Sequence, residues 1–235
     1  MKLSNRLETI VGLIPKNSIL ADIGTDHGYI PRHVIEKKIS KFVIATDISS
    51  PSLDKTREIV KNEKLDKMID TRLGDGLSPI KEFEVDVVLI AGMGGILISE
   101  ILQSAKEKLD TFGNYIFQPM VGADELRKYL VNNGFQIINE ELSKEEDKIY
   151  EIILAQRGLQ VFENRIDYEI NPLLIEKKHP LWKEMISNKI KQKEKILDEI
   201  KDIQTEKSKT RSKELLEEIH IYSEVLNNES SPNNS

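Results

Sequence analysis

Acidic residues and glycines near the N-terminus are spaced as in a nucleotide-binding loop. The stretch Ser18-Ile-Leu-Ala-Asp-Ile-Gly-Thr-Asp-His-Gly-Tyr29 opens as a short apolar run, ends that run at Asp22, and passes Gly24 and Gly28 into a helical pattern. Glycines at a strand end let backbone groups approach a ligand that a Cβ atom would block. A second apolar run ends at Asp47, and an acidic residue about 20 positions on is where such folds hold ribose hydroxyls. The spacing therefore predicts a nucleotide-type cofactor site.

The loop also indicates which cofactor binds. A dinucleotide site has the pattern G-x-G-x-x-G, which places a pyrophosphate on a helix N-terminus. Here the loop is Asp22-x-Gly24-x-Asp26-x-Gly28, closer to the acidic-x-G-x-G-x-G loop of methyltransferases, with Asp26 in the middle glycine's place. A carboxylate at Asp22 suits a ligand with an ammonium and a sulfonium, and would repel a pyrophosphate. The loop favours S-adenosyl-L-methionine, with a nicotinamide cofactor as the alternative.

Alternating strand and helix patterns must position this loop. Apolar, largely β-branched runs lie at 18–22, 42–46, 68–73, 85–90 and 114–118. Helical patterns lie at 3–12, 29–38, 51–63, 95–108 and 122–133. This alternation implies a parallel α/β sheet, and the strand-like runs 135–142 and 148–155 then follow each other as a hairpin. That ending is typical of a Rossmann-like seven-stranded class I methyltransferase domain, which we expect over residues 1–158.

The remainder of the chain has a different pattern. Beyond Gly158 there is no glycine, and apolar residues recur at helical spacing from 181 onward, with Lys193 interrupting at one core position. A second such stretch covers 212–226, and the polar segment 205–212 is the expected turn. Two heptad-like stretches joined in this way predict a C-terminal α-helical coiled-coil hairpin, which we place at 159–226. The polar residues 227–235 are expected to form a disordered tail.

Composition limits the possible classes of protein. The chain has no cysteine, which excludes a disulfide framework and a thiolate metal site, and we expect no metal. Its N-terminus has no apolar signal region and no run is long enough to cross a membrane, so we expect a cytoplasmic protein without a membrane partner. The formal net charge is −6, yet seven lysines against two acids lie between Lys177 and Lys195. Such a run is either a solvated helix face or a nucleic-acid contact.

Several motifs together resemble one family, the bacterial tRNA (adenine-22-N1)-methyltransferases called TrmK. The matching segments are Leu3-Ser-Asn-Arg-Leu7, Asp22-Ile-Gly-Thr-Asp-His-Gly28, Thr46-Asp-Ile48, Gly74-Asp-Gly-Leu77, Ala91-Gly-Met-Gly-Gly95, Gln118-Pro-Met120 and Lys148-Ile-Tyr-Glu151. The resemblance covers nearly the whole chain and includes Asp26. It implies a cytoplasmic enzyme that uses S-adenosylmethionine to methylate N1 of adenine 22 in the D-arm of tRNA, which is its macromolecular partner.

The resemblance and the loop chemistry give roles to particular residues. The expected cofactor-binding residues are Asp22, Gly24, Gly28, Asp47, Ile48, Gly74, Asp75, Gly76 and Ala91. Asp47 is expected to accept from the ribose hydroxyls, although it could cap a helix, and Asp75 from the adenine amine, although Asp-Gly is a common turn. Asp26 and His27 are the expected catalytic residues. A helix N-cap and a structural contact are their respective alternatives.

A motif that is missing after the fourth strand argues against an exocyclic amine as the target, which agrees with the N1 target that the resemblance implies. Enzymes that methylate an exocyclic amine commonly carry an acidic or Asn residue, Pro-Pro and an aromatic there, and Ala91-Gly-Met-Gly-Gly95 has none of these. Adenine N1 has a lone pair at pH 7, so positioning can carry most of the catalysis. The expected substrate-binding residues are Arg6, Met93, Gly94, Lys189, Lys191 and Lys195. A small-molecule methyltransferase and a non-enzymatic coiled-coil adaptor are the competing hypotheses.

Overall fold

The computed structural model describes residues 3–203 and 205–228. It contains two compact units, Met1–Leu173 and Leu174–Ser235. The first unit therefore extends beyond the boundary expected at 158. The segment that follows the hairpin, for which the sequence pattern gave no element, holds two short helices, α6 (Ile166–Glu169) and α7 (Pro172–Glu176).

A seven-stranded mixed sheet forms the centre of the first unit, as expected. Its strands are β1 (Ser18–Ile23), β2 (Ser40–Asp47), β3 (Ile69–Leu73), β4 (Val87–Met93), β5 (Asn114–Pro119), β6 (Phe135–Glu145) and β7 (Lys148–Arg157). Their order is β3-β2-β1-β4-β5-β7-β6, and β7 runs antiparallel to both of its neighbours. The strand order reverses between the neighbours β1 and β4, because the chain returns from the edge strand β3 to β4. Open α/β sheets bind their ligands at such a point.

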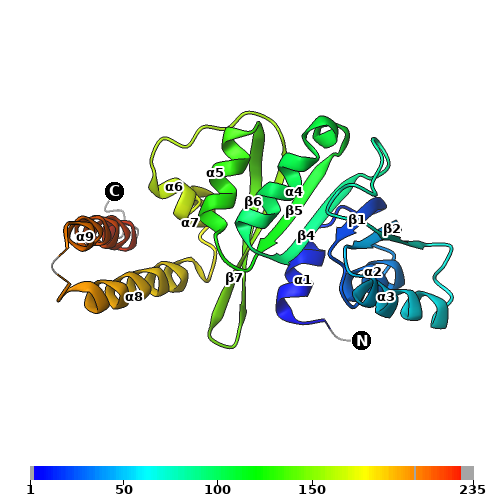
Figure 1. Ribbon diagram of the computed structural model, residues 1–235, viewed down its shortest axis with the longest axis horizontal. Coiled ribbons are helices and arrows are strands. Elements are labelled where there is room, and N and C mark those ends of the chain that lie inside the picture. Colours follow the sequence, from blue (N-terminus) through cyan, green and yellow to red (C-terminus); the bar gives the residue numbers. More distant parts are fainter. Residues whose placement is uncertain (1–2, 204, 229–235) are drawn as a thin grey trace, which may run out of the picture. The chain divides into compact units, whose positions relative to one another are not determined.

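Helices cover both faces of this sheet (Figure 1). One apolar core contains buried residues of α1 (Asn5–Gly12), α2 (Tyr29–Glu36) and α3 (Ser50–Asn62). The opposite core contains those of α4 (Gly95–Ser104) and α5 (Ala123–Asn132). The helix expected over 95–108 is shorter than predicted, because α4 ends at Ser104 and a 3-10 helix, η1 (Lys106–Thr111), follows it.

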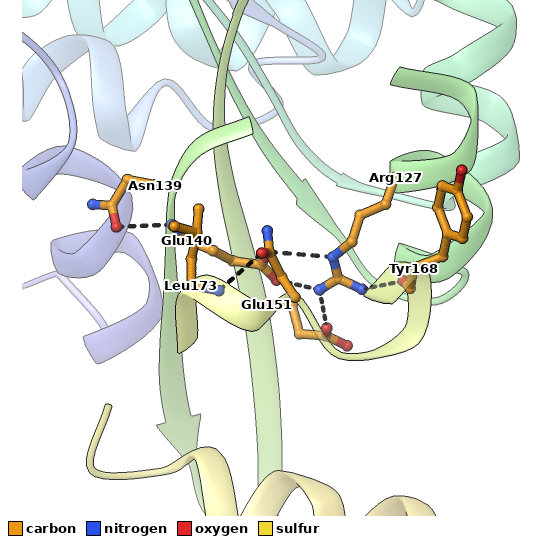
Figure 2. Close-up of polar contacts among 7 residues, drawn as sticks. Arg127, Asn139, Glu140, Glu151, Tyr168 and Leu173 are labelled. Carbon is orange, nitrogen blue, oxygen red and sulfur yellow. Dashed lines mark hydrogen bonds and ion pairs between the residues drawn. The ribbon is translucent and has the colours of Figure 1, made fainter. Parts of the chain in front are cut away.

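A buried charge cluster fastens α5 to the antiparallel hairpin (Figure 2). Arg127 of α5 is fully buried and bonds to the carboxylates of Glu140 on β6 and Glu151 on β7. Its Nη1 also donates to the carbonyl oxygen of Tyr168 at 2.9 Å. The Asn171 amide donates to Glu140 Oε2 at 2.8 Å. The cluster thus ties the segment after β7 back onto the sheet with charge-assisted bonds.

The second unit is a helical hairpin formed by α8 (Trp182–Ile200) and α9 (Glu206–Asn228). Trp182, Ile186, Leu215 and Tyr222 are buried in it. The turn is shorter than the expected 205–212, since α9 already begins at Glu206. Of the expected tail, 227–228 belong to α9, and 229–235 lie outside the described residues.

No helix among residues 3–203 and 205–228 is long and apolar enough to cross a bilayer.

Candidate active site

Most of the expected site residues of the first unit line one cleft, at the carboxyl ends of β1, β2 and β4. The cleft has a volume of about 1020 Å³. The predicted residues that line it are Arg6, Asp22, Gly24, Asp26, His27, Asp47, Ile48, Gly74, Asp75, Gly76, Ala91 and Met93. Gly28 and Gly94 are not among its lining residues. Elements far apart in the sequence therefore bring most of the predicted residues together, as the strand order requires.

Asp22 is the most deeply buried acid of the cleft, with 5% of its surface exposed. Burial raises the pKa of its carboxyl from 3.8 to about 6, and the nearby Asp47 carboxylate acts in the same direction, against an opposing contribution from Thr25. Neither of these neighbours is a cation. A cationic group of a ligand would therefore stabilise the ionised form of Asp22.

Asp47, at the end of β2, holds the first loop in place. Its Oδ1 accepts from the backbone N–H of Ser49 at 2.8 Å, and its Oδ2 lies 3.3 Å from the backbone N of Asp26, which donates to it. Asp47 does not cap α3, because the N-cap of that helix is Ser49, whose hydroxyl accepts from Ser52. The helix-cap alternative for Asp47 is thus wrong. The half-buried carboxylate instead links the ends of β1 and β2.

Asp26 and His27 form a small polar group with Lys55 of α3. His27 Nδ1 lies 3.1 Å from Asp26 Oδ2, and Lys55 Nζ lies 3.7 Å from Asp26 Oδ1 and 3.5 Å from His27 Nε2. The Asp26 backbone has a φ of +46° and its carbonyl accepts from the Thr56 hydroxyl at 3.1 Å. The N-cap of α2 is Gly28, without a side-chain cap. The N-cap alternative for Asp26 is therefore also wrong.

The two loop glycines are needed for different reasons. Gly24 has a φ of +74°, and a Cβ there would lie 2.3 Å from the terminal methyl of Met93, a residue that also lines the cleft. Gly28 has a φ of +64° and faces Thr56, whose Cγ2 would lie 2.8 Å from an added Cβ. Because Gly28 does not line the cleft, its backbone geometry and its packing on α3 already account for a glycine there.

The loop after β3 completes the cleft. The backbone N–H of Gly74 donates to the Asp47 carbonyl at 3.0 Å, which brings this loop against the end of β2. Asp75 between Gly74 and Gly76 is exposed, and the neighbouring Ile48 has 68% of its surface exposed. The exposed carboxylate and the exposed aliphatic side chain suit a ligand with both a polar edge and a flat apolar face. Among the described residues, no group of His, Cys, Asp or Glu side chains is arranged to hold a metal ion.

Arg6 reaches the cleft from α1, on the side of β5 and the β6–β7 hairpin. Its Nη1 donates to Gln118 Oε1 at 2.5 Å, its backbone N–H donates to Glu145 Oε1 at 2.9 Å, and its guanidinium lies 5.3 Å from the Tyr150 ring centre. The side chain is partly buried rather than displayed on the surface. Arg6 is thus held at a fixed place on the cleft wall.

The lysines of α8 do not form one basic face. Residues two positions apart on a helix do not face each other, so Lys189 and Lys193 share one side, and Lys191 and Lys195 another. Lys193 is half-buried, bonds to Glu218 of α9 at 2.6 Å and lies 5.2 Å from the Tyr222 ring centre. Lys189 is also half-buried, whereas Lys191 and Lys195 are exposed. The predicted RNA-contacting lysines Lys189, Lys191 and Lys195 therefore do not share one face of α8, and only Lys191 and Lys195 of these are exposed.

Sequence reasoning missed several lining residues. Tyr29 is 40% exposed at the cleft, with its ring 5.3 Å from that of His27, and Leu97 and Glu145 also line the wall. An aromatic residue directly after the last glycine of the loop is a sequence signal that could have indicated Tyr29. Lys55 carries no such signal, because its place depends on how α3 packs.

The chain is similar to tRNA methyltransferases over most of its length. A family model described as "TrmK: tRNA (adenine(22)-N(1))-methyltransferase" matches residues 20–224. The curated tRNA (adenine(22)-N(1))-methyltransferase of Bacillus subtilis (strain 168) is 32% identical, over 96% of this chain and 98% of that protein.

Solved structures are similar over the same extent. A Streptococcus pneumoniae protein in complex with S-adenosyl-L-methionine is 30% identical with a TM-score of 0.85, covering 96% of this chain and 100% of that chain. The TrmK of M. capricolum, in complex with S-adenosyl-homocysteine, is 26% identical with a TM-score of 0.81, covering 97% of this chain and 99% of that chain.

Proposed function

The chain belongs to the TrmK family of tRNA (adenine(22)-N(1))-methyltransferases, and we propose that the cleft described above is where it carries out this reaction. The enzyme transfers a methyl group from S-adenosylmethionine to N1 of adenine 22 in tRNA. The observation that carries the assignment of the site is the convergence of Asp22, Asp26 and Asp47 on one cleft.

The acids of the cleft fit the cofactor. S-adenosylmethionine supplies an electrophilic methyl group when it is bound. We assign Asp22 to its ammonium group, because a buried carboxylate with a raised pKa gains most from a cationic partner. Asp47 is assigned to the ribose hydroxyls and Asp75 to the adenine amine, since ionised carboxylates accept and do not donate. Gly24 and Gly76 give the backbone access that the ligand needs.

The chemistry of the target atom sets what the protein must do. Adenine N1 carries its lone pair at pH 7, so no proton has to leave before attack. The walls around Met93 therefore act by holding the base in line with the methyl group, and such positioning contributes much of the rate. Position 22 lies inside the folded D-arm, so the base must leave its stack to enter the cleft.

Asp26 is assigned to the charge that develops on the purine. Methylation of N1 leaves the base cationic, and a carboxylate beside it stabilises that charge as it forms. His27, whose Nδ1 lies 3.1 Å from Asp26 Oδ2, contacts the base or takes up a proton from the product. Lys55 lies near both groups, and it keeps the Asp26 side chain at the cleft mouth.

The remaining proposed contacts are with the RNA. Arg6 on the cleft wall and the exposed Lys191 and Lys195 of the second unit are assigned to tRNA phosphates. A tRNA substrate also supports a cytoplasmic location, which we propose for this enzyme.

The assignment of Asp26 is tested by single-turnover kinetics of Asp26→Asn. If Asp26 stabilises charge on the purine, the rate at saturating cofactor and tRNA should fall by about tenfold to a hundredfold, while both dissociation constants change little. Asp54→Asn is the matched control, an exposed acid on α3 that does not line the cleft. The product is located by mass-spectrometric mapping of the tRNA. Equal losses of rate and cofactor affinity would make Asp26 a cofactor-binding residue instead.

A further inference from the structure

Three large aliphatic side chains stand exposed beside the cleft, at the start of α4 and in the loop after β5. Ile96 is 63% exposed, Leu97 is 47% exposed and Val121 is 71% exposed. We refer to these three residues as the apolar lip. Single exposed aliphatic residues are ordinary on protein surfaces, whereas neighbouring ones at the edge of a cleft mark an interaction site.

The lip is continuous with the cleft and is held rigidly. Leu97 lines the cleft itself. The backbone N–H of Gly95 donates to the Val121 carbonyl at 2.8 Å, and that of Met120 donates to the Met93 carbonyl at 2.7 Å. A Cβ on Gly95 would lie 1.9 Å from the carbonyl oxygen of Gly122. The ends of β4 and β5 are thus in backbone contact, and α4 and α5 begin side by side (Figure 1).

The chemistry of the lip selects one part of an RNA. Its three side chains offer no hydrogen bond and no positive charge. The charged side chains that line a shallow hollow together with Ile96 are Glu100, Glu125 and Lys128, and Asp124 also lies in the first turn of α5. Acids therefore outnumber bases here. Phosphates would be repelled from this place, whereas the uncharged faces of bases would be covered well.

The proposed function requires such a surface. An adenine that enters the cleft leaves a gap in the D-arm stack, and its two neighbouring bases lose a partner. Proteins that open base stacks fill the gap with Leu, Ile or other apolar side chains. Because N1 must reach the cleft, these bases lie at its mouth, where the lip stands.

We propose that Ile96, Leu97 and Val121 form an apolar wedge that packs against the bases on either side of the extruded adenine 22. The proposal rests on the cleft being the methyl-transfer site. It makes the lip a determinant of base extrusion, distinct from cofactor binding and from backbone contacts.

The test uses the full chain and a tRNA with 2-aminopurine at position 22, whose fluorescence rises when the base leaves its stack. The variant Ile96→Ser/Val121→Ser avoids the residues that line the cleft. Its matched control is Leu159→Ser/Val161→Ser, two exposed aliphatic residues that follow β7. Leu159 and Val161 follow the end of β7 that pairs with the start of β5. They therefore lie at the amino ends of the parallel strands, whereas the cleft lies at the carboxyl ends.

We expect wild type and the control to raise the fluorescence equally. The lip variant should lose most of this rise and should methylate unmodified tRNA roughly tenfold more slowly in a single turnover at saturating tRNA. Cofactor affinity, measured by calorimetry, should not change. A lip variant with the fluorescence rise and rate of the control would overturn the proposal.

Two other results would also overturn it. One is a variant that loses tRNA affinity but extrudes the base normally once saturated, which would make the lip a general docking surface. The other is a change in self-association alone, measured by sedimentation, which would make the lip a protein interface. Failure of the wild-type enzyme itself to methylate position 22 would instead contradict the proposed function.

Discussion

Asp22 in the cleft and Glu140 behind α5 are both buried carboxylates, but their surroundings differ. Glu140 is fully buried beside the Arg127 guanidinium and the Asn171 amide. The carboxylates of Glu140 and Glu151 raise the pKa of Arg127 above its ordinary value, although burial acts to lower it. Asp22, in contrast, has a raised pKa of about 6 because of burial, with a second acid adding to it.

The difference separates structural charges from binding charges. A buried carboxylate with a permanent cation holds elements together, and it gains nothing from a ligand. A buried carboxylate without a neighbouring cation lowers the stability of the folded protein at neutral pH, and it gains a cationic partner only when a ligand binds. The four predictions below test this distinction.

The largest effect is expected at the permanent pair. Arg127→Met leaves Glu140 and Glu151 near each other without the guanidinium between them, and it should lower the free energy of unfolding by about 3–5 kcal/mol. Urea unfolding followed by circular dichroism measures this. The control is Arg32→Met, which breaks a partly exposed ion pair with Glu36 and Glu63 and should cost at most about 1 kcal/mol. Equal losses of unfolding free energy in the two variants would show that the buried charge cluster stabilises the fold no more than an exposed ion pair does.

A smaller effect is expected from Asp22→Asn, and on a different quantity. The variant should bind S-adenosylmethionine about 1.5–3 kcal/mol more weakly, because a charged hydrogen bond is lost. Its free energy of unfolding at pH 7 should not fall, since the folded protein no longer holds an ionised buried carboxylate. Calorimetry measures the cofactor affinity, and urea unfolding measures the free energy of unfolding. A variant that binds normally but unfolds easily would show that Asp22 is structural.

The raised pKa of Asp22 gives two pH dependences of opposite sign. Between pH 3.8 and about 6 the folded state binds the proton more tightly, so the contribution of Asp22 to stability is present below this window and is lost as the pH rises through it. Cofactor binding needs the ionised form, so affinity should fall by about tenfold per pH unit below pH 6. Titrations at several pH values test this, and Asp22→Asn should flatten the profile. A wild-type dissociation constant that is equal at pH 5 and pH 7 would contradict it.

The smallest effects are expected in the second unit, where the lysines of α8 also divide into structural charges and proposed binding charges. Lys191→Gln/Lys195→Gln should weaken tRNA binding several-fold and reduce its salt slope by up to about 2, because fewer counterions are released. Lys189→Gln/Lys193→Gln should instead lower the melting temperature of the hairpin, since Lys193 is bonded to Glu218. Filter binding at several salt concentrations and a circular-dichroism melt check both. The reverse pattern would assign the RNA contact to the half-buried pair.

The features that were predicted from sequence depend on local patterns. Asp22 and Asp47 are predicted because each ends an apolar run, and Asp26 because it occupies the middle glycine's place in the loop after the first run. The carboxyl ends of parallel strands meet at one edge of a sheet. The hairpin of β6 and β7 was found because two strand-like runs lack a helix between them. The family resemblance supplied Gly74, Asp75 and Ala91.

The features that were missed depend on tertiary packing. The Arg127 cluster joins α5, two strands and the short helix α6, and no spacing in the sequence indicates that these groups meet. Lys55 approaches Asp26 only because α3 packs beside the loop. The closeness of the α8 lysines in the sequence predicts one basic face, whereas the helical period separates them onto two sides.

The position of Trp182 makes the unfolding of the second unit observable by fluorescence. It is the only tryptophan of the chain, and it is buried in the second unit. Emission excited selectively at the indole therefore reports on the helical hairpin alone, while circular dichroism sums over both units. A mismatch between the two unfolding curves would reveal that the hairpin and the sheet unfold as separate cooperative bodies. The wild-type sequence thus already contains a site-specific fluorophore, with no label to attach.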